Sequence, residues 1–168
     1  MSDQNHKAII IFAMYCCGKT YLYRNNKKYT FYDIDEIIDP RPDIAPDDYR
    51  HYCKLYLYKD IIKENLYKYD FILVPGFTCI MKELDKENIE YVVVYPERSI
   101  ESYNEWRDRN YNRKTVWLWK WVKSDFFKIT KLLNSNCAIK KYELKPNQYL
   151  SDIIDQIYAD CNSYEALK

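Results

Sequence analysis

Residues 13–20 read Ala-Met-Tyr-Cys-Cys-Gly-Lys-Thr and match the second half of a phosphate-binding loop. The full pattern, G-x-x-x-x-G-K-[ST], places backbone N–H groups, a lysine and a hydroxyl around nucleotide phosphates. In this register we expect Lys19 to reach the β- and γ-phosphates, Thr20 to hold Mg²⁺, and Gly18 to permit the turn. The nucleotide-binding residues predicted from the loop are Ala13, Tyr15, Cys16, Cys17, Gly18, Lys19 and Thr20.

Alanine stands at position 13, where the pattern has its first glycine. This departure is mild, provided that the backbone of Ala13 suits a residue with a Cβ. The chain has only two glycines, and Gly18 directly precedes Lys-Thr, between a strand-like and a helix-like segment. The alternative is an ordinary strand-to-helix turn with a chance Gly-Lys-Thr. We favour the phosphate loop because so rare a residue falls where the motif requires it.

The adjacent thiols of Cys16 and Cys17 allow two interpretations. A helix N-terminus activates thiols, which would suit a redox switch or a vicinal disulfide. The alternative, which we favour, is that both are small residues tolerated inside the loop. The six cysteines form no C-x-x-C pair, and the two histidines lie at no ligand spacing. We therefore expect reduced thiols, a cytoplasmic location and no zinc site.

Two acidic residues, Asp33 and Asp35, follow a second strand-like run in the stretch FYDIDEII, residues 31–38. On an extended segment, residues two apart face the same side. At the carboxyl end of a strand beside the loop, that side is the crevice where α/β proteins bind ligands. A carboxylate there can hold Mg²⁺ or orient an acceptor hydroxyl. The alternative is a pair of turn acids or a cap for a helix from Glu36 onward.

The pairing of C-C-G-K-T with Y-D-I-D-E resembles the small P-loop kinases of the shikimate-kinase and nucleoside-monophosphate-kinase group. It also resembles small nucleotide-kinase-like P-loop proteins of phages. The resemblance implies that Asp33 is the metal-side aspartate and that Asp35 positions or deprotonates the acceptor. Residues 71–77 match the third strand, where shikimate kinases carry a glycine triplet; only Gly76 is present here, which argues against shikimate. No acidic residue ends that strand, so the conventional Walker B carboxylate is missing.

Kinases of this group cover the phosphates with a lid that supplies arginines. The segment 97–115 lies where that lid belongs, and its predicted catalytic arginines are Arg107, Arg109 and Arg113. The alternative is a solvated helix face on which the interleaved acids pair the arginines. The stretch VWLWKWVK, residues 116–123, could stack nucleic-acid bases. We favour ordinary packing of its tryptophans against the sheet.

The elements that must position these residues alternate between strands and helices. The expected strands are Lys7–Met14, Tyr29–Ile34, Phe71–Val74, Tyr91–Tyr95 and Ala138–Leu144. The expected helices are Lys19–Asn25, a stretch from Asp47 or Asp48 to Lys68, Thr78–Lys86, Val116–Leu133 and Tyr149–Tyr158. Such alternation predicts right-handed crossovers and a mostly parallel sheet. We therefore expect one domain over residues 1–168, with a three-layer α/β/α P-loop kinase-like fold of about five strands.

Bulk composition excludes several classes of protein. The chain has 168 residues and a formal net charge of +1, so no global field attracts it to nucleic acid or to a membrane surface. The longest apolar run, residues 8–17, is far shorter than the roughly 20 residues of a membrane helix, and we expect neither a signal peptide nor a membrane partner. The bias toward Tyr, Lys, Asn and Ile indicates an AT-rich coding genome, as in many phages and large viruses; the location would then be the host cytoplasm.

Three functions remain open from the sequence. The leading hypothesis is a phosphotransferase that moves the γ-phosphoryl group of ATP, or of another NTP, with Mg²⁺. Its catalytic residues would be Lys19, Asp35 and the three arginines of the lid. The resemblance implies a nucleotide or another small phosphate acceptor, and a variant of the hypothesis acts on modified nucleotides or on a 5′-hydroxyl of DNA. The alternatives are a catalytically impaired nucleotide-binding regulator and an α/β interaction protein in which Gly-Lys-Thr is fortuitous.

Overall fold

The computed structural model describes residues 6–14, 16–38, 58–76, 78–112 and 138–165. Within these residues the chain forms one five-stranded sheet in the order β2-β3-β1-β4-β5. The strands are β1 (Ile9–Ala13), β2 (Phe31–Asp33), β3 (Phe71–Pro75), β4 (Tyr91–Pro96) and β5 (Ala138–Leu144). The helices are α1 (Lys19–Asn25), α2 (Ile34–Ile38), a helical stretch at 58–65, α4 (Thr78–Lys86), α5 (Ile100–Asn112) and α7 (Leu150–Glu165).

All strand pairs in this sheet are parallel. Strand β1 lies at the centre, where Ile9 pairs with Phe71 of β3 and Ile11 pairs with Val92 of β4. Every residue of β1, β3 and β4 is buried. Continuous apolar runs of this kind are typical of parallel strands covered on both faces, because neither side of the strand meets water.

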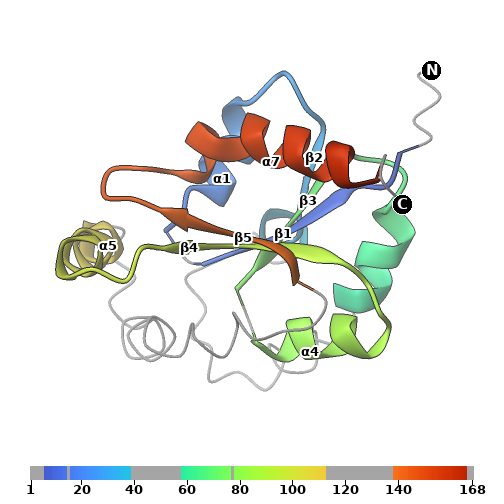
Figure 1. The fold of residues 1–168 in the computed structure, drawn as a ribbon, viewed down its shortest axis with the longest axis horizontal. Helices are drawn as coiled ribbons and strands as arrows, with labels where there is room; N and C mark the ends of the chain where they lie inside the picture. Colours follow the sequence, from blue (N-terminus) through green and yellow to red (C-terminus); the bar gives the residue numbers. More distant parts are fainter. Residues whose placement is uncertain (1–5, 15, 39–57, 77, 113–137, 166–168) are drawn as a thin grey trace.

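Helices cover both faces of the sheet, as Figure 1 shows. Helices α1 and α7 lie on one face, and α4 and the helical stretch at 58–65 lie on the other. Helix α5 follows β4 and lies beyond the carboxyl ends of the strands. The expected three-layer α/β/α architecture is therefore confirmed, with a sheet that is wholly parallel in the described part of the chain.

Most expected elements agree with the structure to within a few residues, and one expectation is wrong. The second strand was expected to continue to Ile34, but β2 ends at Asp33 and helix α2 starts at Ile34. Asp33 and Asp35 therefore do not share an extended segment. The backbone N–H of Asp35 donates to Oδ1 of Asp33 over 3.2 Å, a local bond that turns the chain out of the strand. The acidic first turn of α2 then favours the helix.

Other expectations lie on residues outside the described ranges. These are the proline-containing segment 39–46, the start of the helix expected from Asp47 or Asp48, and the tryptophan-rich helix expected over Val116–Leu133. Helix α7 is longer than the expected Tyr149–Tyr158 and continues to Glu165. In the part of the chain that the structure describes, no helix combines the length and apolar character needed to cross a membrane.

The topology creates a switch point beside β1. Strands β1 and β3 are neighbours, but α1 after β1 and α4 after β3 lie on opposite faces of the sheet (Figure 1). The two connections therefore diverge at the carboxyl ends of these strands. In open α/β sheets such a switch point is where ligands bind. The loop at residues 14–18 starts at this point.

The second glycine of the chain also lies at the switch point. A Cβ added at Gly76 would lie 3.2 Å from the Cα of Met14 and 3.4 Å from the carbonyl oxygen of Ala13. The connection after β3 thus approaches Ala13 and Met14 so closely that a side chain at position 76 would require the neighbouring backbone to shift by a few tenths of an ångström. Both glycines of the chain therefore lie at the segment of residues 13–18: Gly18 is part of it, and Gly76 packs against its first residues.

We expect Gly76→Ala to destabilise the protein by about 1–3 kcal/mol, because backbone atoms of Met14 must move to admit the methyl group. Urea unfolding monitored by circular dichroism measures this change. Ser102→Ala is the control, because the hydroxyl of Ser102 is buried without a hydrogen-bond partner within the described residues. Equal free energies of unfolding for Gly76→Ala and wild type would show that the close approach is not required.

Candidate functional site

The loop between β1 and α1 has left-handed residues on both sides of Cys17. Ala13 is fully buried at the end of β1, and its φ is not in the left-handed region, so alanine is accommodated without strain. The left-handed residues are Cys16, with φ 61°, and Gly18, with φ 92°. Alternation of left-handed and ordinary residues is typical of backbone concavities that bind anions. Here the N–H of Cys17 already donates to the carbonyl oxygen of Met14 over 3.4 Å. Tyr15, which was predicted to contribute to this loop, lies outside the described residues.

The N-terminus of α1 has no side-chain cap. Gly18 occupies the N-cap position, no side-chain hydrogen bond is formed there, and the first turn holds no acidic residue. The first N–H groups of a helix have no partner inside the helix and carry partial positive charge. Among the described residues neither a side-chain cap nor a first-turn acid satisfies these donors, as in helix starts that bind phosphate. The hydroxyl-bearing residue, Thr20, is half-buried in the same turn.

Lys19 is buried and points back toward the strand. Its Nζ donates to the carbonyl oxygen of Ala13 over 3.0 Å, and only 8% of the residue is exposed. A buried lysine is uncommon unless its charge has partners. The ammonium group also stabilises the ionised form of Asp33, which identifies the two as electrostatic neighbours.

Asp33 is the most unusual ionisable residue of the site. It is fully buried, one oxygen accepts the N–H of Asp35, and Oδ2 has no hydrogen-bond partner among the described residues. Burial raises the pKa of Asp33 to about 6, an effect that the neighbouring Lys19 partly opposes. A buried carboxylate with an unused oxygen beside a phosphate loop fits the requirements of a hydrated Mg²⁺, which takes one or two carboxylates plus phosphate oxygens.

The residue predicted to face the acceptor, Asp35, is half-buried in the first turn of α2. It therefore lies two residues beyond the carboxyl end of β2, within the first turn of the helix, and not on the strand itself. In the described ranges no three His, Cys, Asp or Glu side chains converge on a single point. A Mg²⁺ ion held by Thr20, Asp33 and nucleotide phosphates would not need such a cluster.

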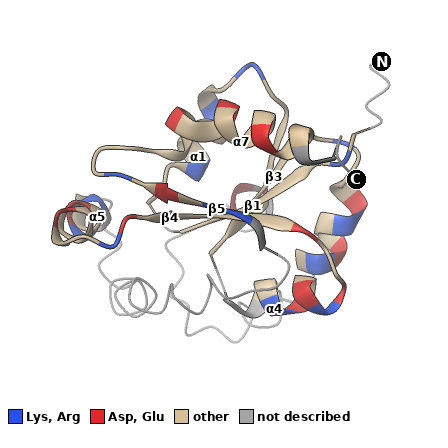
Figure 2. Cartoon of the chain, viewed as in Figure 1, with Lys and Arg blue, Asp and Glu red and all other residues tan. Residues whose placement is uncertain are grey.

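Helix α5 occupies the segment predicted to be a lid, and acids are interleaved with its arginines (Figure 2). Arg109 pairs with Glu105 one turn earlier, and Arg107 pairs with Asp108 over 3.0 Å. The alternative to a catalytic role, in which neighbouring acids pair these arginines, therefore agrees with the structure for both residues. Arg113 lies outside the described residues. Helix α5 is anchored by Trp106, which is 2% exposed.

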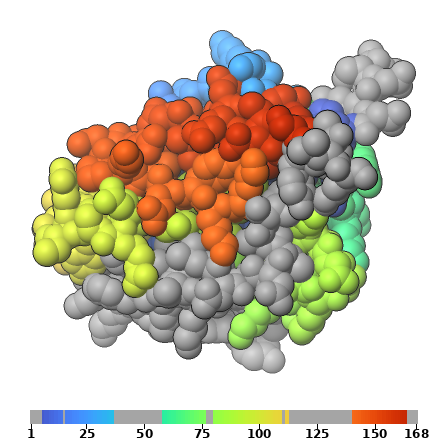
Figure 3. All heavy atoms as spheres, in the orientation of Figure 1, coloured from blue at the N-terminus to red at the C-terminus, as the bar shows by residue number. Residues whose placement is uncertain are grey.

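Arg109 also reaches the loop between β1 and α1. One terminal nitrogen lies 3.4 Å from the carbonyl oxygen of Cys16 and 3.4 Å from that of Gln148. The guanidinium carbon lies 3.8 Å from the centre of the Tyr149 ring, a cation–π arrangement. The structure thus brings α5 and the β5–α7 connection together on the loop, and their surfaces adjoin in Figure 3.

Sequence reasoning did not identify the residues of the β5–α7 connection. The N–H of Leu150 donates to the carbonyl oxygen of Cys17 over 2.9 Å. A Cβ at Gly18 would lie 3.3 Å from a ring carbon of Tyr149. No motif marks these residues, because they reach the loop only through the packing of α7 beside α1.

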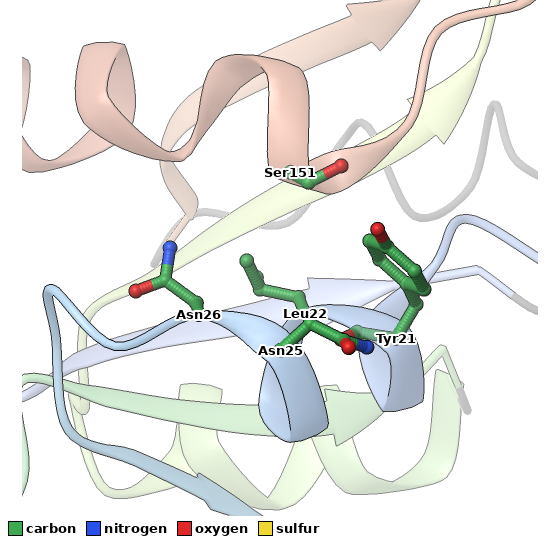
Figure 4. Close-up of a pocket in the computed structure, with 5 residues that line it drawn as sticks. All are labelled: Tyr21, Leu22, Asn25, Asn26 and Ser151. Carbon is green, nitrogen blue, oxygen red and sulfur yellow. The ribbon is translucent and has the colours of Figure 1, made fainter.

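A small groove of about 180 Å³ lies behind the loop, between α1 and the first turn of α7 (Figure 4). It is lined by Tyr21, Leu22, Asn25, Asn26 and Ser151. Its two amides already have local partners: Asn25 donates to the carbonyl of Tyr21, and Asn26 accepts the N–H groups of Lys28 and Tyr29. We therefore assign the groove to the packing of the two helices and not to the candidate site.

Comparison with known proteins gives no relative from which a function could be transferred. No family model, no curated protein and no solved structure matches the chain. The functional argument therefore depends on the residues and geometry described above.

Proposed function

We propose that the protein is a P-loop phosphotransferase that uses ATP, or another NTP, and Mg²⁺ to phosphorylate a nucleotide or a related small acceptor. In this proposal Lys19 and the N–H groups of the loop bind the phosphates. Thr20 and Asp33 would hold the metal, which supplies charge neutralisation on the transferring phosphoryl group. Asp35 would orient or deprotonate the acceptor hydroxyl.

The observation that supports this proposal most directly is the placement of Asp33 beside Lys19. A fully buried carboxylate with one unpartnered oxygen is unfavourable in an unliganded fold, and such groups concentrate at functional sites. Here it lies next to a buried lysine and an uncapped helix start, at the switch point of a parallel sheet. The ammonium of Lys19, which would bind phosphates, and the carboxylate of Asp33, which would bind a metal, are therefore neighbours.

A nucleotide-binding regulator without catalysis is the second candidate. Strand β3 ends in Pro75 and Gly76 and carries no acid. Arg109, one of the predicted catalytic arginines, is paired with Glu105 and with loop carbonyls. Both features favour a site that binds a nucleotide without transferring its phosphate.

Transfer of labelled phosphate distinguishes the two candidates. Radiolabelled ATP with Mg²⁺ is offered together with nucleoside monophosphates, modified deoxynucleotides and 5′-hydroxyl oligonucleotides. We expect incorporation into one acceptor class. Nucleotide binding without incorporation into any of them would support the regulator, and the absence of nucleotide binding would exclude both candidates.

Asp35→Asn tests the role of the acceptor-side acid. We expect phosphoryl transfer to fall by at least about 10²-fold, the lower range for loss of a general acid–base group. The affinity for Mg²⁺·ATP should remain close to that of wild type, because Asp35 lies in helix α2 and not in the loop that would bind the phosphates. Glu36→Gln, a change on the next residue of the same helical turn, is the matched control. Full transfer activity in Asp35→Asn would remove Asp35 from the catalytic role.

A further inference from the structure

A phosphate-binding loop must turn its carbonyl oxygens away from the ligand. The peptide unit is planar, and its C=O and N–H groups point in opposite directions. A donor that holds the carbonyl of one residue therefore also fixes where the N–H group of the next residue points. Carbonyl oxygens on the outside of such a loop need donors from the surrounding fold.

In this protein two of those carbonyls are held from outside the loop. The carbonyl of Cys17 accepts the N–H of Leu150 over 2.9 Å, which orients the N–H of Gly18. The carbonyl of Cys16 accepts the guanidinium of Arg109 at 3.4 Å. The N–H of the same peptide unit, on Cys17, donates to the carbonyl oxygen of Met14 over 3.4 Å, so this peptide unit is held from both ends. The carbonyl of Cys17 is held by a backbone donor, whereas the carbonyl of Cys16 is held by a side chain from α5.

Arg109 is itself held on several sides. Glu105 pairs with its terminal nitrogen, and the other oxygen of Glu105 accepts the N–H of Asn147 over 2.7 Å. The carbonyl of Gln148 shares the nitrogen that reaches Cys16, and the ring of Tyr149 lies under the guanidinium plane. The side chain of Arg109 is only 17% exposed. These contacts fix the guanidinium before any ligand arrives.

The residue that Arg109 holds has a strained backbone. Cys16 has φ 61°, a conformation that costs a residue with a side chain on the order of 1–2 kcal/mol. Such a conformation persists only when the surroundings impose it. The bond from Arg109 to the Cys16 carbonyl is a side-chain contact that imposes it directly.

We propose that Arg109 is a positioning residue that holds the phosphate loop in its binding conformation through the carbonyls of Cys16 and Gln148. This role differs from that of a lid arginine that neutralises phosphate charge. The inference rests on the proposed function for the identity of the ligand, but its effect on the loop can be measured without one. Glu105 belongs to the same unit, because it orients the guanidinium.

Thiol labelling tests the loop in the absence of nucleotide. The sulfhydryl groups of Cys16 and Cys17 are buried in the loop, and that of Cys161 is buried in α7 and serves as the internal reference. We expect Arg109→Ala to raise the rate at which N-ethylmaleimide labels the loop cysteines by roughly tenfold or more, because a charge-assisted hydrogen bond is lost. Arg109→Lys should restore part of the protection, since its ammonium can still donate to one carbonyl.

Arg24→Ala is the matched control, because it removes an arginine–glutamate pair on the exposed ends of α1 and α2. Its labelling rates should equal those of wild type. Unchanged labelling of Cys16 and Cys17 in Arg109→Ala would overturn the proposal. An equal rise in the labelling rate of Cys161 would indicate general loosening of the fold and would also count against the proposal. The proposal would survive that result only if Arg109→Lys lowered the labelling rates of Cys16 and Cys17 and left that of Cys161 raised.

Nucleotide affinity then separates positioning from direct phosphate contact. If Arg109 positions the loop, Arg109→Ala weakens the binding of ATP and of ADP by the same factor, about tenfold to 10²-fold. Glu105→Ala then weakens the binding of both nucleotides as well. If Arg109 neutralises the γ-phosphate, the loss is confined to ATP, and Glu105→Ala tightens binding by releasing the arginine. The second pattern would overturn the proposal. Absence of nucleotide binding by wild type would refute the proposed function instead, and the labelling result would still decide the role of Arg109.

Discussion

Replacement of Lys19 by methionine is expected to abolish the stabilisation of the protein by Mg²⁺·ATP. Wild type at a ligand concentration of about 100 times Kd should gain about 2.7 kcal/mol, which raises Tm by roughly 5–10 °C for a chain of this size. Methionine keeps the buried stem of Lys19 but removes the ammonium that would pair with the phosphates under the proposed function. Thermal unfolding with and without Mg²⁺·ATP measures the difference.

Lys27→Met is the matched control for this experiment. Lys27 is exposed in the connection that follows α1, so the variant removes an equal charge away from the loop. It should retain the full rise in Tm. An equal rise in Lys19→Met would show that the nucleotide binds elsewhere, and no rise in wild type would favour the interpretation in which Gly-Lys-Thr is fortuitous.

Replacement of Asp33 by asparagine is expected to stabilise the unliganded protein at neutral pH. The pKa of Asp33 is raised from 3.8 to about 6, so the folded state binds its proton more tightly than the unfolded state. Stability is therefore lost as pH rises between these two values, and above pH 6 the penalty is complete, with an upper limit of about 3 kcal/mol. Asparagine can still accept the N–H of Asp35, and it carries no charge to desolvate.

Urea unfolding between pH 4.5 and pH 7.5 tests this expectation. The advantage of Asp33→Asn over wild type should be small at the acidic end and should grow to about 1–3 kcal/mol at the neutral end. A difference for Asp33→Asn that does not change with pH would rule out the ionisation of Asp33 as its cause.

Asp33→Asn should also weaken the effect of Mg²⁺ on nucleotide binding. If Asp33 holds the metal, Mg²⁺ should increase nucleotide affinity in wild type and have little effect in Asp33→Asn. Titration of ATP with and without Mg²⁺ by calorimetry measures this. An unchanged effect of Mg²⁺ in the variant would remove Asp33 from the metal site. Higher stability together with weaker function is the usual sign that a residue is kept for its chemistry.

The layered fold and the loop could be predicted from the sequence for physical reasons. Apolar runs bounded by polar segments mark strands that are buried on both faces, and residues 71–75 and 91–96 are of this kind. Gly18 marks the loop, because its φ of 92° is a conformation that few other residues adopt readily. These features depend on interactions close in the sequence.

The rest of the site depends on contacts between distant segments. Alternation of residues predicted that Asp33 and Asp35 lie on one strand, but the bond from Asp35 to Asp33 ends that strand first. The contact of Arg109 with the carbonyl of Cys16 joins residues 93 positions apart, and no local pattern encodes it. Tyr149 packs on Gly18 for the same reason, through the docking of α7.

The central position of β1 has a consequence for synthesis on the ribosome. Ile9 pairs with Phe71, and Ile11 pairs with Val92, so β1 has no neighbouring strand in the sheet until some 60 later residues have emerged. At ~5–20 residues per second this interval lasts about 3–12 s. Residues 14–18 of the loop are translated early, but the segments that contact the loop, which include Arg109 and Leu150, are translated late. We therefore expect nascent chains that stop before β3 to expose an apolar strand and to depend on chaperones during that interval.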